Sequence, residues 1–325
     1  MTAILGMGNA LVDILVSLEN DDLLSQFQLP KGSMQLVDRE FSGMVLDGTT
    51  HLPHTLASGG SAANTIHGLA RLGISTAFLG EVGQDDYGKF FQKDLEASNI
   101  RPILLQSTTE SGRVVALISP DSERTFATYL GAAVELSSEG VHPAHFEGYS
   151  IFHIEGYLVY NHELMLKAMK LAKECGLKIS LDLASYNVVE ANLGFLKEVM
   201  RQFVDIVFAN EEEAKAFTGK NPEEALEELA ELCEIAVVKV GSKGSFVRRG
   251  TEKHSIGVIQ AKSIDTTGAG DLYAAGFLYG LINEKPLNQC GEIGALLAGT
   301  VIEVIGAKIP DAAWTVIREK LKMMR

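Results

Sequence analysis

Short apolar segments alternate with helical patterns along most of the chain, and this alternation constrains the fold more than any other feature. Four-residue segments rich in apolar and β-branched side chains predict buried strands at residues 4–7, 150–153, 178–181, 205–208 and 236–239. Helical patterns, such as those at residues 163–174 and 222–233, lie between them. Because a strand–helix–strand order implies parallel pairing, we predict an α/β fold with a doubly wound, mostly parallel sheet flanked by helices. Ligands of such a sheet bind beyond the carboxyl ends of its strands.

Two stretches interrupt this rhythm, at residues 14–50 and 100–130. They contain short alternating segments without a long helix, at residues 33–37, 103–105, 114–119 and 125–130. We interpret them as a small β-rich lid, and residues 1–13, 51–99 and 131–325 as the α/β body that binds the ligands. The alternative is that these segments form edge strands of the main sheet.

The net charge narrows the classes of partner, and the cysteines indicate the cellular compartment. The chain has 28 Lys and Arg against 42 Asp and Glu, a net charge of −14, which disfavours nucleic acid and anionic membranes. Cys175, Cys233 and Cys290 are odd in number and far apart, which is typical of reduced thiols in the cytoplasm. No apolar run approaches the roughly 20 residues of a membrane span. We therefore expect a cytoplasmic protein that binds neither nucleic acid nor membranes. Pairing two lids would cover their exposed sheet edges, so a monomer and a homodimer both stay open.

One glycine turn matches a dinucleotide-binding fingerprint only in part. Gly6-Met7-Gly8-Asn9-Ala10-Leu11 follows a predicted strand but lacks the third glycine. No acidic residue ends a strand about twenty residues later, where one would hold a ribose. A dinucleotide-dependent oxidoreductase is therefore a remote alternative.

The strongest motif is Asp265-Thr266-Thr267-Gly268-Ala269-Gly270-Asp271, which runs directly into a helical pattern. Small residues at 268–270 let backbone amides converge at a helix start, where the helix dipole favours an anion. A helix cap, the structural alternative, needs one Asp, whereas this loop has two. Asp271 beside such a loop fits a base that removes the proton of an alcohol during phosphoryl transfer.

A second motif, Ser58-Gly59-Gly60-Ser61-Ala62-Ala63-Asn64-Thr65, opens a helix with an apolar face. Asn64 lies off that face, and the two glycines allow a ligand to approach the backbone closely. An ordinary helix start is the alternative. Asp13 follows the first predicted strand in an apolar stretch, so it needs a polar partner, which sugar hydroxyls would supply.

The early segment from Gly59 to Asn64 and the late segment from Asp265 to Asp271 resemble the two signatures of the ribokinase (phosphofructokinase B-type, pfkB) carbohydrate kinase family. The resemblance covers essentially the whole chain. Val82-Gly83-x-Asp85-x-x-Gly88 is similar to a turn of that family, and Asn210-Glu211-Glu212-Glu213 resembles its Asn-x-x-Glu motif. Lys239-Val240-Gly241-Ser242-Lys243-Gly244 resembles its nucleotide-side turn.

The resemblance implies an ATP-dependent kinase that phosphorylates a hydroxymethyl group. Asp271 would be the general base, and the amides of Gly268, Ala269 and Gly270 would hold the negative charge of the phosphates. The residues that would bind the acceptor are Asn9, Asp13, Gly60, Asn64 and Arg124. The residues that would contact ATP are Lys239, Gly241, Gly244 and Thr267. Arg124 would reach a phosphate from the lid, with a solvated turn arginine as the alternative.

The resemblance also implies metal ions. Asn210 and Glu213 would order Mg²⁺ through its waters. Many relatives bind a monovalent cation such as K⁺ beside the glycine loop, and Asp265 would lie next to it.

The spacing of Asn9 and Asp13, and of Gly60 and Asn64, looks more like the adenosine kinase arm of the family. This favours a nucleoside over a free sugar such as ribose or fructose, and both acceptors stay open. Tyr157 and Phe126 are candidates to stack on a base, although either could belong to the core. A lid over this acceptor is expected to close when the acceptor binds, because transfer requires that water be excluded.

Overall fold

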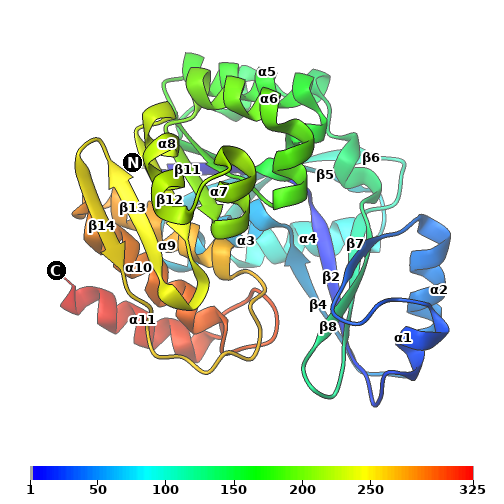
Figure 1. Cartoon of the computed structure of the whole chain (residues 1–325). Helices are drawn as coiled ribbons and strands as arrows, with labels where there is room; N and C mark the ends of the chain where they lie inside the picture. Colours follow the sequence, from blue (N-terminus) through cyan, green and yellow to red (C-terminus); the bar gives the residue numbers. More distant parts are fainter. Residues whose placement is uncertain (1–2, 325) are drawn as a thin grey trace.

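The computed structural model describes residues 3–324 and contains two β-sheets (Figure 1). The main sheet has nine strands in the order β14-β13-β12-β11-β10-β9-β1-β5-β6. Their bounds are β1 (Ala3–Met7), β5 (Ser75–Gly83), β6 (Ile100–Ser107), β9 (Ile151–Glu155), β10 (Lys178–Asp182), β11 (Ile206–Asn210), β12 (Ile235–Lys239), β13 (Ser245–Arg249) and β14 (Glu252–Ile256). Strands from β12 to β6 pair in parallel, and β13 and β14 are antiparallel. The predicted doubly wound, mostly parallel α/β fold is confirmed.

Helices cover both faces of the main sheet because its central strands are apolar on both sides (Figure 1). Alternate residues such as Ile4 and Leu5 belong to different core clusters, one on each face. The helices of the first face are α3 (Ser61–Arg71), α4 (Asp86–Ala97), α9 (Ala269–Ile282), α10 (Leu287–Val301) and α11 (Asp311–Met323). Those of the second face are α5 (His162–Glu174), α6 (Tyr186–Phe203), α7 (Glu211–Thr218) and α8 (Pro222–Leu232).

A second, five-stranded sheet, called here the small sheet, has the order β3-β8-β7-β2-β4. Its strands are β2 (Leu11–Ser17), β3 (Met34–Leu36), β4 (His54–Gly59), β7 (Gly112–Ile118) and β8 (Arg124–Tyr129). Figure 1 shows it beside the main sheet, with α1 (Asp22–Gln26) and α2 (Arg39–Thr49) next to it. The small sheet corresponds to the β-rich stretches that we predicted as a lid.

The boundaries of the predicted lid need correction. Residues 100–107 form β6, which pairs with β5 at the edge of the main sheet, so for residues 103–105 the edge-strand alternative holds. Helix α4 connects β5 to β6 as a parallel crossover. The small sheet also includes β4, which follows the predicted stretch 14–50.

The stretch 14–50 also contains a helix that its sequence pattern did not predict. Helix α2 has 11 residues and is capped by Asp38, whose side chain accepts a hydrogen bond from the Phe41 amide at 2.8 Å. Gly43 and Gly48 lower its intrinsic helix propensity. At Gly48 a side chain would collide with the Phe27 ring, so tertiary packing explains the glycine there.

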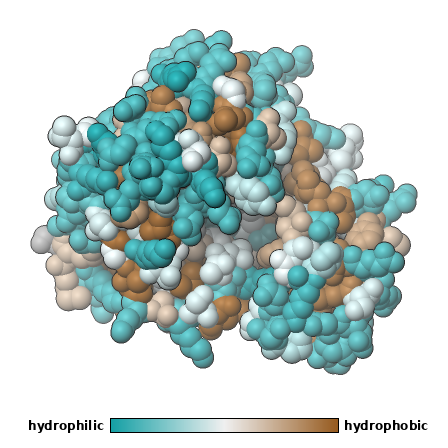
Figure 2. All heavy atoms as spheres, in the orientation of Figure 1, coloured by the Kyte–Doolittle hydropathy of each residue, from teal (hydrophilic) through white to brown (hydrophobic). Residues whose placement is uncertain are grey.

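The face of the molecule in Figure 2 is hollowed between the small sheet and the main body, with hydrophobic residues along the flanks of the hollow. This hollow lies at the carboxyl ends of the main-sheet strands, where the fold predicts a ligand. Within residues 3–324, no helix is both long and apolar enough to cross a membrane.

Candidate active site

A cavity of about 1670 Å³ runs along the carboxyl ends of the main-sheet strands and reaches the small sheet. Most of the predicted site residues line it: Asn9, Asp13, Gly60, Asn64, Asn210, Glu213, Lys239, Gly241, Gly244, Thr267, Ala269, Gly270 and Asp271. Segments from most of the length of the chain thus meet at one place. Gly268, Asp265 and Arg124 are not among the residues that line it.

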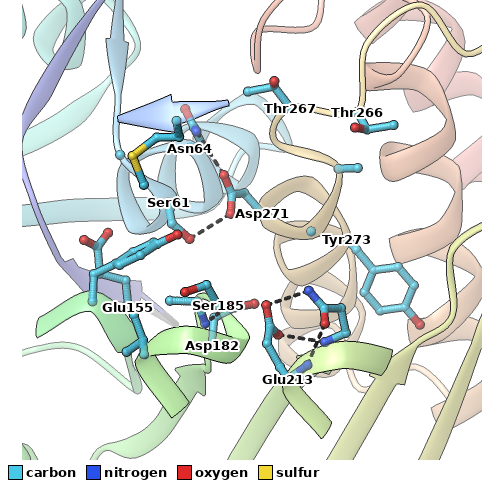
Figure 3. A pocket seen from close by; sticks show the side chains of 18 of the residues that line it. Ser61, Asn64, Glu155, Asp182, Ser185, Glu213, Thr266, Thr267, Asp271 and Tyr273 are labelled. Carbon is cyan, nitrogen blue, oxygen red and sulfur yellow. Dashed lines mark hydrogen bonds between the residues drawn. The ribbon is translucent and has the colours of Figure 1, made fainter. Parts of the chain in front are cut away.

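Asp271 lies in the first turn of α9 and is held by α3 (Figure 3). Its Oδ1 accepts a hydrogen bond from Ser61 Oγ at 2.7 Å, and its Oδ2 accepts one from Asn64 Nδ2 at 2.9 Å. Thr65 Oγ1 donates to the backbone oxygen of Asp271 at 3.1 Å, which ties the two helices together. Burial, opposed by these hydrogen bonds to the carboxylate, raises the pKa of Asp271 to about 6. A carboxylate with this pKa can take up a proton near neutral pH.

The loop that leads into α9 has the geometry of an anion site. Gly268 is left-handed, with a φ of 74°, and a Cβ there would lie 2.5 Å from the Cβ of Ala307. The Ala269 amide donates to Thr266 O at 3.2 Å, so the loop itself engages one of the three predicted amides. Within residues 3–324, no acceptor is found for the amides of Gly268 and Gly270. These two amides at a helix start are available to a phosphate.

Asn9 is positioned by Glu155, a residue that the sequence motifs did not identify. Glu155 is fully buried at the end of β9, and its Oε1 accepts hydrogen bonds from Asn9 N at 2.9 Å and Asn9 Nδ2 at 2.8 Å. Its Oε2 accepts the Ala62 amide at 2.9 Å, at the start of α3. Burial raises the pKa of Glu155 to about 7, although these three hydrogen bonds oppose the shift. Glu155 therefore joins Asn9 to the α3 end of the site.

Two amide oxygens in this part of the cavity, Asn9 Oδ1 and Asn64 Oδ1, are buried and have no hydrogen-bond partner among residues 3–324. Their orientation is fixed, because the Nδ2 of each residue donates to a carboxylate, which can only accept. A buried acceptor without a donor is costly, so hydroxyl groups of a ligand suit both positions.

Asp13 lies in β2, with its carboxylate packed over Gly59. Burial raises the pKa of Asp13 to about 7, and the nearby charge of Lys308 opposes the shift. Lys308, also missed by the sequence motifs, donates to Ser58 Oγ at 3.0 Å, and burial lowers its pKa to about 8. Gly60 has a φ of 98°, and a side chain there would collide with the Asn9 carbonyl. The glycine pair lets Asp13 and Asn9 approach the start of α3.

Arg124 neither reaches into the cavity toward a phosphate nor lies in solvent, the two positions predicted from the sequence. Its guanidinium forms an ion pair with Asp265, and its Nη1 donates to Thr267 Oγ1 at 2.7 Å. The side chain is 6% exposed and does not line the cavity, so a solvated turn arginine is excluded. The guanidinium supplies the positive charge beside Asp265, where we expected a monovalent cation. Asp265 also accepts the Thr267 amide at 2.9 Å and the Gly306 amide at 2.6 Å.

Comparison with known proteins identifies the family. The model of pfkB family carbohydrate kinases matches residues 44–314. The chain belongs to the pfkB family of carbohydrate kinases. This membership rules out the oxidoreductase alternative, because kinases of this family are phosphotransferases.

Relatives of this pfkB kinase include proteins named for different acceptors. The crystal structure of adenosine kinase from Sinorhizobium meliloti superposes with a TM-score of 0.87 at 34% identity, over 98% of this chain and 99% of that one. That of a probable sugar kinase from Rhizobium etli CFN 42 gives 0.89 at 34% identity, over 99% of both chains. A nucleoside kinase from Methanocaldococcus jannaschii is 28% identical over 271 residues, which span 82% of this chain and 86% of the relative.

The side of the cavity opposite the small sheet carries two buried acidic residues, Asp182 and Glu213. Asn210 and Glu213 bond each other reciprocally at the start of α7, with Asn210 Nδ2 donating to Glu213 Oε1 at 2.6 Å. Asp182, another residue missed by the motifs, ends β10, and its Oδ2 accepts a hydrogen bond from Lys239 Nζ at 3.1 Å. Burial and the charge of Asp182 raise the pKa of Glu213. Figure 3 shows Asp182 and Glu213 on the same side of Asp271.

These carboxylates fit a hydrated metal ion. Asp182, Glu213 and Asp271 line one cavity, and burial together with the charge of Asp182 disfavours the ionisation of Glu213 and Asp271, so a cation among them would be stabilised. In the described chain no group of three His, Cys, Asp or Glu side chains is arranged to ligate a metal directly. The donor set therefore suits Mg²⁺ that keeps its waters.

A slot with apolar walls continues the cavity beyond the glycine loop. It is lined by apolar residues of the loop between β14 and α9, by small residues of α10 and by the residue after α10, namely Val258, Ile259, Ala295, Ala298, Gly299 and Ile302. Gly241 and Gly244 border it, and a side chain at Gly244 would collide with the Ile256 carbonyl. A flat base fits such a slot.

Proposed function

We propose that this pfkB kinase transfers the γ-phosphoryl group of ATP to the primary hydroxyl of a nucleoside. The observation that carries the acceptor assignment is a chamber with apolar walls directly beside the hydroxyl-binding residues. The part of the cavity next to Asn9 and Asp13 is lined by Leu11, Val114, Phe126, Leu130, Ala133, Leu136, Tyr157 and Leu158. Such walls suit a nucleobase, whereas a free sugar would leave them without an apolar partner.

The polar end of this chamber supports a ribose. Asn9 Oδ1 and Asn64 Oδ1 are buried acceptors without a partner in the described part of the chain, and Asp13 is a buried carboxylate. Three acceptors in a small space suit adjacent hydroxyl groups, which donate hydrogen bonds. Tyr157 and Phe126 supply aromatic surface to the chamber and are candidates to contact the base.

In this pose the primary hydroxyl lies next to Asp271. Its oxygen attacks the γ-phosphorus, the bond from that phosphorus to the β–γ bridging oxygen breaks, and Asp271 accepts the hydroxyl proton. The amides of Gly268 and Gly270 stabilise the negative charge of the phosphoryl group. Bound with ATP, Mg²⁺ supplies positive charge to the phosphates. Asp182, Asn210 and Glu213 would hold it through water.

A phosphorylation screen tests the proposal. Nucleosides, ribose and fructose are each supplied with ATP and Mg²⁺, and ADP release is measured together with the mass of the product. We expect kcat/KM for the best nucleoside to exceed that for either sugar by at least about a hundredfold, because burial of a base adds several kcal/mol of binding. A free sugar that is phosphorylated at least as well as every nucleoside would contradict the acceptor assignment.

A further inference from the structure

Lys239 reaches across the carboxyl edge of the main sheet. It ends β12, and its ammonium pairs with Asp182 at the end of β10, with β11 between the two strands. Nζ and Asp182 Oδ2 are 3.1 Å apart, and the two side chains are 16% and 8% exposed. Both residues line the cavity, so this charge pair is part of its floor.

The same ammonium lies against the glycine loop. A Cβ atom at Gly270 would lie 2.9 Å from Lys239 Nζ, so the glycine leaves the space that the ammonium occupies. Gly270 is in the first turn of α9, where the helix dipole is positive and the Gly268 and Gly270 amides have no acceptor within residues 3–324. One fixed cation and a helix start thus meet at the same point of the cavity.

Carboxylates keep this ammonium charged and in place. Although burial opposes its charge, Asp182, Glu213 and Asp271 hold the pKa of Lys239 above its usual value. An ammonium has three N–H donors, and Asp182 is the partner found for Lys239 among the described residues. Among the described residues Lys239 forms an ion pair with Asp182 and none with Asp271.

We propose that Lys239 is a catalytic residue that hydrogen-bonds the phosphoryl group during its transfer, and that Asp182 is the positioning residue that aims it. The proposal rests on the proposed function only in that the γ-phosphoryl group binds at the glycine loop. Phosphoryl transfer depends mostly on positioning and electrostatic stabilisation. In the transition state, negative charge spreads over the oxygens of the transferring phosphoryl group. Lys239 keeps its protons throughout, while Asp271 accepts the proton of the acceptor hydroxyl.

The test compares Lys239→Met with the control Lys215→Met, which removes an exposed lysine on α7 that does not line the cavity. With the best acceptor found for the wild type, we expect Lys239→Met to lower kcat about 10²- to 10³-fold, as loss of one preorganised donor does. Affinity for ADP alone should stay within about twofold, because ADP lacks the transferred group. Affinity for ADP with aluminium fluoride, which mimics the phosphoryl group in the transition state, should fall by about the same factor as kcat.

Two results would overturn the proposal. One is a kcat of Lys239→Met within about threefold of wild type. The other is an equal loss of affinity for ADP alone and for ADP with aluminium fluoride, which would make Lys239 a general nucleotide contact. The fluoride measurement needs no acceptor, so it decides the role of Lys239 even if the nucleoside assignment fails.

Two further variants guard against misfolding and test Asp182. If Lys239→Met does not fold because Asp182 is left unpaired, Lys239→Met combined with Asp182→Asn removes both charges, and the same affinities are compared. Asp182→Asn alone should lower kcat with little change in acceptor KM, and unchanged kcat would overturn the positioning role of Asp182.

Discussion

Arg124 of the small sheet is paired with Asp265 of the loop that leads into α9, and the two side chains are only 6% and 4% exposed. The pair joins the sheet we predicted as a lid to the loop we predicted as the phosphate site. Nε of Arg124 has no hydrogen-bond partner among residues 3–324. The conformation of the phosphate loop therefore depends on a residue of the small sheet.

Removing one member of this pair should destabilise the protein strongly. Arg124→Met would leave the buried Asp265 carboxylate without its counter-ion, so we expect the free energy of unfolding to fall by about 3–5 kcal/mol. The double variant Arg124→Met/Asp265→Asn should recover part of this loss. Urea unfolding of the four proteins in the cycle measures the coupling. Additive effects of the two substitutions would show that the pair contributes nothing beyond its separate residues.

The acid limb of the activity profile should report two carboxylates. The pKa of Asp13 is about 7 and that of Asp271 about 6, and both must be ionised to bind and activate the acceptor. We expect kcat/KM for the acceptor to fall as the pH drops below about 7 and to fall more steeply below about 6. Asp13→Asn should remove the upper step and keep the lower one. A flat wild-type profile from about pH 8 to about pH 5 would contradict both assignments.

Asp13→Ala should weaken acceptor binding selectively. The substitution removes a charged hydrogen-bond acceptor from the hydroxyl end of the chamber, so the acceptor KM should rise about tenfold or more. The KM for ATP should stay near the wild-type value, and the exposed Asp22→Ala on α1 serves as the control. Equal weakening of both substrates would make Asp13 a structural residue.

Acceptor binding should close the small sheet over the cavity. Met34 and Leu36 of β3 line the cavity yet are 52% and 66% exposed, so closure would bury apolar surface. We expect hydrogen exchange to slow in β3 and β8 when a saturating nucleoside is added, with α11 as an unaffected reference. Unchanged exchange in both strands would rule out a closing lid.

Strands β1, β9, β10, β11 and β12 of the main sheet were predictable because they are short and apolar on both faces, whereas β5, β13 and β14 were not predicted. Each predicted strand segment lies within one or two residues of an observed strand, as at residues 178–181 and β10. Residues 103–105 were misplaced, because an alternating strand has the same pattern at the edge of either sheet. The crossover through α4, which lets β6 pair in parallel with β5, places these residues in the main sheet.

Most of the site residues that the motifs identified line the cavity, and the functional residues that they missed act through tertiary contacts. Glu155 and Asp182 end strands β9 and β10, so a search for acids at predicted strand ends would have found both. Lys308 lies in a loop that returns to β4, where it contacts Ser58. No local sequence pattern encodes this contact. Arg124 follows a Pro-Asp-Ser turn, which is typical of a solvent-exposed side chain. However, β8 begins at Arg124 and places its side chain against Asp265.

The Asp271→Asn variant, assayed with ATP, Mg²⁺ and the best nucleoside, decides whether this carboxylate is the base of a kinase. Asparagine can still bond Ser61 and Asn64 but cannot take up a proton, so the fold and ATP affinity should be kept. We expect kcat to fall at least about a hundredfold, while Asp86→Asn, an exposed substitution on α4, should leave it unchanged. Activity of Asp271→Asn near that of the wild type would contradict the assignment.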